Sequence, residues 1–514
     1  MALPRTLVVG FDGGTWNLLD PLLSAGWLPN LRRFLAGALR AGLRSVDPPV
    51  TIPAWYSAMT GLSPGQMDIW GFAKPTHTPG ELQLVRTYRP HEAIWDILGR
   101  RGWRIGVVNF PAVPAPPVHG YFVSGMVGGT PEEMVYPSAL RSELGSSGNP
   151  WHHDLVRTRG DGLRAALAEA MESLAQKARF VEARESSDPS DFLFVLFSET
   201  DRIQHNFLHS LRHPAPEDLR DVRAFWGTLD DAFGRVLAAF HGKGSPPGYT
   251  WLLSDHGFGP TEGYVFTNRY LLREGYLVEG ASVPFRWRPL VSDVAARVDA
   301  LIPLAPFVRP KGGGASRPPP GAPMRDGDGT DQTFSWYSRF VDWSRTRAVS
   351  FPVPEAIYAN HYRGEMTPES LRSLRKDLVR SFAQFPGGAI DAVDPSRLYG
   401  VELGPMSPIL LLSSHGGAWE VRGDMNHLFP RLPRRPSYFE REGTHRPVGI
   451  FAVAGPGIPP GSRGEPYPLL GVFPLILSAL GVRPPGAGGT PVPGDWAKLF
   501  PVQPSGRGKG PGGM

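Results

Sequence analysis

Short apolar runs alternate with longer amphipathic segments over the first half of the chain. Residues 6–11, 191–197 and 249–254 are mostly apolar and too short for typical helices, so we predict that they are buried strands. Helical spacing of apolar residues predicts helices between them, and the longest span 163–186 and 215–240. Strands that alternate with helices indicate an α/β fold with a mostly parallel central sheet.

The same patterns predict further elements along the rest of the chain. Strands are expected at 104–109, 121–124, 348–362, 408–412 and 448–454, and helices at 16–38, 91–101, 368–385 and 467–480. The alternation of strand and helix is interrupted after about residue 280, which suits a smaller inserted cap. We therefore predict a first core segment at 1–280, an insert at 281–400, a second core segment at 401–500 and a tail at 501–514. The insert contains a Pro/Gly-rich stretch at 309–329, and we expect this loop and the tail to be disordered.

Composition excludes several classes of function. The formal net charge of +5 is mild for 514 residues and no dense basic helix is present, so no nucleic acid partner is expected. The chain has no Cys, which excludes disulfides, thiolate metal sites and a cysteine nucleophile. Neither a signal peptide nor an apolar run of membrane-spanning length is recognisable, so a cytoplasmic location is expected.

Carboxylate and imidazole side chains stand at the ends of the predicted strands, where open α/β sheets bind their ligands. Six residues share this position: Asp12, Asp201, His205, Asp255, His256 and His445. Taken singly, each has an ordinary interpretation as a cap, a turn residue or part of a local ion pair. Taken together, three Asp and three His form an oxygen and nitrogen ligand set that suits zinc or manganese.

Thr51 lies in a proline-flanked stretch, 48–56, that is followed by a helix-like run at 57–61. By itself this pattern favours a Thr that caps the start of a helix. A threonine close to bound metal has a second possible role, because a metal lowers the pKa of a hydroxyl and makes it a nucleophile. The residues around Thr51 leave both roles open.

Several motifs resemble those of the alkaline phosphatase superfamily, most closely its type I phosphodiesterase/nucleotide pyrophosphatase branch. The matching motifs are FDGG at 11–14, VTIPAW at 50–55, TGLSPG at 60–65, TDRIQH at 200–205, SDHGF at 254–258 and GTHRP at 443–447. The resemblance spans roughly residues 6–482. It implies a three-layer sandwich with a central, mostly parallel sheet and a smaller inserted cap.

The resemblance also implies a two-metal site that hydrolyses a small phosphorylated substrate through a covalent phosphothreonine. Thr51 would be the nucleophile. One divalent ion, zinc or alternatively manganese, would be held by Asp12, Thr51, Asp255 and His256, and the other by Asp201, His205 and His445. The expected activity is that of a phosphodiesterase or nucleotide pyrophosphatase.

The chain departs from the family pattern beside the nucleophile. In many nucleotide pyrophosphatases an Asn follows the nucleophile by three residues, whereas this chain has Ala54, whose backbone N–H we expect to bind the substrate instead. Met67 and Asp68 stand where the family often has His-Gly, so specificity for nucleotides does not follow. The alternatives are a phosphomutase or phosphomonoesterase acting on a small phosphorylated metabolite, and a non-catalytic protein that binds a phosphorylated ligand.

Overall fold

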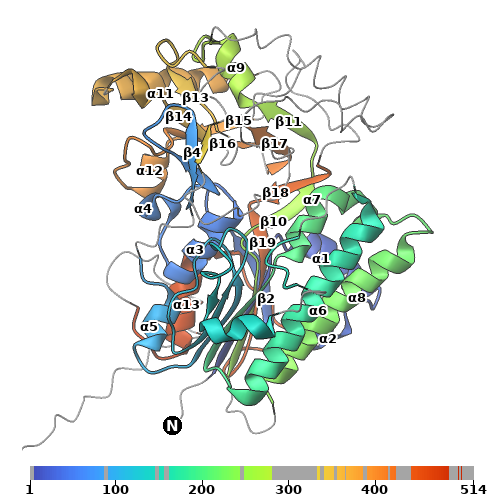
Figure 1. Ribbon diagram of the computed structural model, residues 1–514. Helices are drawn as coiled ribbons and strands as arrows, with labels where there is room; N and C mark the ends of the chain where they lie inside the picture. The colour runs from blue at the N-terminus through green and yellow to red at the C-terminus, as the bar shows by residue number, and fades with distance from the viewer. Residues whose placement is uncertain are drawn as a thin grey trace, which may run out of the picture.

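A computed structural model of the chain is shown in Figure 1. It describes residues 5–499 except for 86–90, 145–149, 156–160, 243–247, 281–332, 336–340, 352–355, 365, 386–389, 415–416, 424–440, 485–495 and 497–498. The loop and tail that we expect to be disordered, 309–329 and 501–514, lie outside the described residues.

A central sheet, nine-stranded over the described residues, forms the middle layer of the fold. Its strands, in order across the sheet, are β20 (Tyr467–Pro468), β2 (Leu39–Arg44), β19 (Val448–Ala454), β9 (Tyr249–Leu253), β1 (Thr6–Phe11), β8 (Phe192–Phe197), β5 (Ile105–Phe110), β6 (Gly120–Ser124) and β7 (Val135–Tyr136). The five strands from β9 to β6 are parallel to one another. β19 runs antiparallel to β9, so its amino end lies at the same edge as the carboxyl ends of β9, β1 and β8.

Helices cover both faces of this sheet, and the predicted three-layer α/β arrangement is confirmed (Figure 1). One face carries α3 (Thr51–Thr60), α5 (Ile94–Gly99) and α13 (Val472–Ala479), and the other carries α1 (Trp16–Ser24), α2 (Pro29–Ala36), α6 (Leu163–Ser187), α7 (Glu199–Arg212) and α8 (Leu219–Phe240). The central strands are apolar along their whole length, because successive side chains point to opposite faces and helices bury both faces. Phe194 of β8 packs edge-on against Trp55 of α3, whereas Phe11 of β1 packs against Phe233 of α8.

A smaller layer of sheets and helices forms a cap above the edge of the central sheet at which β10 and β18 lie (Figure 1). Its strands are β3 (Ala73–Pro75), β4 (Glu81–Leu84), β11 (Gly263–Phe266), β12 (Thr333–Ser335), β13 (Ala348–Val349), β14 (Ala356–Ala359), β15 (Ile390–Val393), β16 (Leu410–Ser414) and β17 (Trp419–Arg422). Its helices are α4 (Pro64–Met67), α9 (Thr267–Arg273), η4 (His361–Arg363), α11 (Pro368–Phe382) and α12 (Pro395–Tyr399). The apolar core of the cap includes Leu82, Leu271 and Val421, so it draws on residues outside 281–400. The segment boundaries at 280 and 400 stay a prediction.

Short elements complete the described chain. They are β10 (Gly257–Pro260), β18 (Gly443–Arg446), η2 (Ser138–Glu143) and η6 (Leu469–Gly471). The helix predicted over 467–480 is shorter, because residues 467–468 pair in parallel with β2 and the α-helix begins only at Val472. The strand predicted over 348–362 is divided into β13 and β14, which pair antiparallel. Among the described residues, no helix combines the length and apolar character needed to cross a bilayer.

Candidate metal centre

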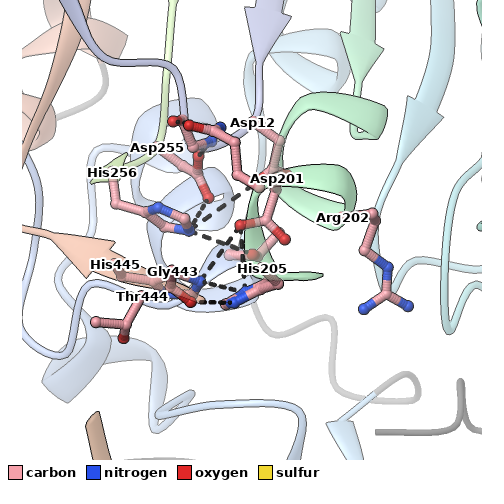
Figure 2. Close-up of polar contacts among 12 residues, drawn as sticks. Asp12, Asp201, Arg202, His205, Asp255, His256, Gly443, Thr444 and His445 are labelled. Carbon is pink, nitrogen blue, oxygen red and sulfur yellow. Dashed lines mark hydrogen bonds and ion pairs between the residues drawn. The ribbon is translucent and has the colours of Figure 1, made fainter. Parts of the chain in front are cut away.

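The predicted ligand residues converge at the edge where β1, β8 and β9 end (Figure 2). Asp12 follows β1 directly, and the pair Asp255 and His256 follows β9. Asp201 and His205 lie in the first turns of α7, immediately after β8. The sixth residue, His445, reaches the same place from β18, whose pairing with β10 sets His445 opposite Phe258. Four separate stretches of the sequence therefore meet in one buried cluster.

One group of ligand atoms surrounds the imidazole of His256. Its Nε2 lies 3.1 Å from Oδ2 of Asp255 and 3.8 Å from Oδ1 of Asp12. The hydroxyl of Thr51 lies 3.5 Å from the same nitrogen. Asp12, Asp255 and His256 are fully buried, and Thr51 is 2% exposed. The structure thus brings together the four residues that the resemblance assigns to one ion.

A second group lies beside the first. Nε2 of His205 and Nε2 of His445 are 3.1 Å apart, and they lie 3.5 Å and 3.3 Å from Oδ1 of Asp201. The rings of His256 and His445 stack with centroids 3.7 Å apart, so the two groups touch. Candidate ligand atoms of Asp201, His256 and His445 also lie within 4.8 Å of one another. His256 is therefore close to both groups, and the division of ligands between two ions stays a prediction.

Backbone carbonyl groups orient all three imidazoles. The acceptors are the carbonyl oxygen of Gly443 for Nδ1 of His205 (3.0 Å), of Gly257 for His256 (3.1 Å) and of Pro49 for His445 (2.7 Å). A carbonyl oxygen can only accept, so each Nδ1 carries the proton and, in a neutral ring, each Nε2 presents a lone pair. Such a bond from the far ring nitrogen is the usual way in which a metal-binding histidine is held.

The residues present fit a cation on two further grounds. Oδ1 of Asp12, Oδ1 of Asp201 and Oδ2 of Asp255 are buried and make no hydrogen bond, and buried polar atoms without partners are rare and costly. Neutral rings of His205 and His445 would point two lone pairs at each other across 3.1 Å. A positive charge between these atoms removes both difficulties, and carboxylate oxygens with imidazole nitrogens are ligands that zinc accepts.

Crowded charge shifts the pKa values of the cluster in opposite directions. Burial raises the pKa of Asp12 well above its usual value, and the charges of Asp255 and Asp201 raise it further. Burial lowers the pKa of His205 and of His445, which keeps both rings in the neutral form that ligates metal.

Thr51 occupies the first position of α3, and Val50 is the residue that caps the helix. The ordinary interpretation of Thr51 as a helix cap is therefore wrong, and its hydroxyl instead faces His256. The expectation for Ala54 needs correction, because its N–H already donates to the carbonyl of Val50 at 3.0 Å. The N–H groups of Thr51 and Ile52 have no acceptor within the helix, since they belong to its first turn.

Hydrogen bonds from residues outside the predicted set hold the Asp12 loop. The indole N–H of Trp55 donates to Oδ2 of Asp12 at 3.1 Å, and the hydroxyl of Thr200 donates to the Asp12 carbonyl at 2.6 Å. Gly13, at φ +63°, donates its N–H to Oδ1 of Asp255 at 3.2 Å. Sequence analysis did not assign these roles. The available signal was the spacing of Trp55, which stands four residues after Thr51 and so shares its helix face.

The three-layer fold and the clustered Asp and His side chains at its sheet edge define the class of protein. It is an α/β protein of the alkaline-phosphatase-like type with candidate ligands for divalent metal. The model of the type I phosphodiesterase / nucleotide pyrophosphatase family matches residues 6–308. This match covers more than half of the 514 residues, and the chain belongs to that family, which is part of the alkaline phosphatase superfamily. A search of curated proteins found no match.

Membership in the family defines the activity in general terms. The family supports a phosphoester hydrolase of the phosphodiesterase/pyrophosphatase type, and its members are metal-dependent and act on small phosphoesters. The matched segment contains Asp12, Thr51 and the ligand pairs that follow β8 and β9. It ends before His445, which β18 nevertheless brings to the same cluster.

Proposed function

We propose that the protein hydrolyses a phosphodiester or phosphoanhydride bond of a small substrate, with Thr51 as the nucleophile and two divalent ions as cofactors. The observation that carries this proposal is the position of the Thr51 hydroxyl. It is buried, lies 3.5 Å from His256 Nε2, and borders a cluster in which three carboxylate oxygens have no hydrogen-bond partner. A threonine with a purely structural role would not need to lie beside three buried carboxylate oxygens that have no hydrogen-bond partner.

Two sets of residues would hold the ions. Asp12, Thr51, Asp255 and His256 form one set, and Asp201, His205 and His445 form the other. When bound, the ions would lower the pKa of the hydroxyl and offset the charge that develops on the phosphoryl oxygens. We expect zinc because three imidazole nitrogens contribute, with manganese as the alternative.

The Thr51 hydroxyl and the N–H groups at the start of α3 would orient the phosphoryl group for reaction. The Thr51 oxygen attacks phosphorus while the bond from phosphorus to the leaving oxygen breaks, and the hydroxyl proton passes to solvent. The N–H groups of Thr51 and Ile52 at the start of α3 would donate to the phosphoryl oxygens, because a helix amino end favours negative charge. Attack by water on the phosphothreonine then releases phosphate monoester and restores the hydroxyl.

A substitution at Thr51 tests the proposal. Hydrolysis of bis(4-nitrophenyl) phosphate should be lost in Thr51→Ala, while the metal content measured by mass spectrometry is retained because the other ligands remain. Thr228→Ala is the matched control, since the Thr228 hydroxyl only donates to the carbonyl of Ala224 on an exposed face of α8. Full activity of Thr51→Ala would refute the role of Thr51 as nucleophile.

Comparison with the monoester separates the alternatives. The proposed function predicts faster turnover of bis(4-nitrophenyl) phosphate than of 4-nitrophenyl phosphate. The reverse order would favour a phosphomonoesterase or phosphomutase, and a metal-free protein without turnover would favour a binding protein. The cytoplasmic location stays a prediction.

A further inference from the structure

A second pocket, of about 390 Å³, lies beside the metal centre. It is bounded by the start of α1, the end of α7, β10 and the junction of β18 with β19. Phe258 belongs to both places, because its ring packs against the rings of His205 and His445 and also lines the pocket. None of the seven residues of the proposed active site lines this pocket. It therefore needs a separate explanation.

The charged residues that line the pocket are both arginines. Within the part of the chain that the structure describes, Arg212, in the last turn of α7, has no partner for an ion pair or a side-chain hydrogen bond. Arg446 donates to backbone carbonyl groups, including those of Gly417 and Pro260, and these neutral acceptors do not cancel its charge. No Asp or Glu is among the residues that line the pocket. Glu262 acts electrostatically on Arg446 from outside the pocket lining, so Arg212 is the guanidinium group that favours an anion as the ligand.

The amino end of α1 opens at the same pocket. Thr15 precedes the helix, is 8% exposed and lines the pocket, yet its hydroxyl makes no capping hydrogen bond. The first turn of α1 contains no acidic residue that would offset the positive end of the helix. A hydroxyl that makes no capping hydrogen bond, beside the unpaired N–H groups of the first turn, is a second feature that an anionic ligand would satisfy.

Apart from Asn17, the remaining side chains of the wall are apolar. Leu18, Leu208 and Phe258 line it, together with Val448, whose side chain is 42% exposed although it is a large hydrophobic residue. The volume is within the range of small-molecule sites. An apolar wall opposite two arginines suits a ligand with one charged end and one apolar end.

We propose that this pocket binds an organic phosphate or phosphonate, with its anionic group at Arg212 and Thr15 and a short apolar substituent against Leu18 and Phe258. The site is independent of the proposed hydrolytic step, because it contains neither Thr51 nor any of the candidate metal ligands. It would let the enzyme bind a phosphorylated compound without cleaving it.

Calorimetric titration of hexylphosphonate into the metal-loaded full chain tests this site, since its carbon–phosphorus bond resists hydrolysis. We expect two binding events. Asp255→Asn should remove the event at the metal centre and leave the second, and Thr51→Ala should leave the second event unchanged whatever its effect on hydrolysis. Arg212→Gln should weaken the second event by about tenfold or more, since hydrogen bonds to charged groups are the stronger ones.

Two further variants strengthen the design. Thr15→Val should weaken the second event by about three- to tenfold, and Val448→Asp should weaken it through repulsion at an already exposed position. Arg220→Gln is the matched control, because Arg220 is an exposed arginine on α8 outside the pocket. The proposal is overturned if Asp255→Asn abolishes all binding, or if Arg212→Gln and Val448→Asp both bind as the wild type does.

Discussion

The indole N–H of Trp55 donates to one carboxylate oxygen of Asp12 at 3.1 Å and leaves the other oxygen without a hydrogen bond. Burial already raises the pKa of this carboxyl, whereas the bond from Trp55 lowers it. Trp55 thus favours the ionised form that can bind a metal. The same residue packs edge-on against Phe194, so one side chain links the sheet core to the candidate ligand.

Removal of this bond should weaken metal binding. We expect Trp55→Phe to reduce metal affinity by about 10- to 100-fold, the usual effect of losing a group that supports a ligand. Competition with a chromophoric chelator measures the affinity. Trp95→Phe is a closely matched control, because Trp95 is equally buried but its indole nitrogen makes no hydrogen bond. Equal losses in both variants would show that the effect comes from packing alone.

Asp255 should couple metal binding to stability. In the wild type, a chelator should lower the melting temperature, because an ion at 100 times its dissociation constant stabilises the folded state by about 2.7 kcal/mol. In Asp255→Asn this metal-dependent gain should shrink or vanish together with hydrolysis. The metal-free variant should melt no lower than the metal-free wild type, since one of three crowded carboxylates is gone. Differential scanning calorimetry with and without chelator measures both quantities.

The buried pair of Lys177 and Glu199 lies beneath the start of α7. Lys177 is 1% exposed and Glu199 is fully buried, and Lys177 also donates to the Ser173 hydroxyl at 2.9 Å. Lys177→Met should cost about 3–5 kcal/mol because it leaves a buried charge unpaired. The double variant with Glu199→Leu should recover most of this loss. Urea denaturation measures the free energy of unfolding, and a double variant as unstable as Lys177→Met would contradict the prediction.

His153 should make stability depend on pH. Burial lowers the pKa of His153 to about 4, below the unfolded value near 6.5, so the proton binds preferentially to the unfolded chain. The stabilising contribution is then complete above about pH 6.5 and is lost as the pH falls toward 4, by roughly 3 kcal/mol in total. In His153→Gln the free energy of unfolding should fall less between pH 7 and 4. His77→Gln, at an exposed position, should retain the wild-type slope.

The sequence predicted the parts of the site that depend on short-range pattern. Asp12, Asp201 and Asp255 each follow an apolar run, and parallel strands bring their carboxyl ends to one edge, so the convergence of these residues followed from the strand assignment. The bonds that orient them depend on contacts between distant segments. Trp55 and Asp12 meet only because α3 packs across β1 and β8, a contact that local periodicity does not encode.

The position of His445 shows the same limit. β18 is four residues long and carries no alternating apolar pattern, and its partner β10 lies far away in the sequence. His445 entered the predicted ligand set because it lies close to the predicted strand at 448–454 and in the GTHRP motif, whereas periodicity gave no sign of β18 itself. The expectation that the Ala54 N–H binds the substrate was wrong for a local reason. Helix geometry directs this N–H to the carbonyl of Val50 rather than to the site.

The antiparallel direction of β19 has a consequence for the order in which the centre assembles. Asp12 precedes the cap in the sequence, whereas His445 is synthesised just before β19, after the cap strands and helices up to β17. Until β19 inserts between β2 and β9, the nascent chain lacks one of the six ligands and the strand that joins the two parts of the sheet. Because domains fold as units during synthesis, occupation of both proposed ion sites, which together need all six residues, would mark a chain whose central sheet is closed.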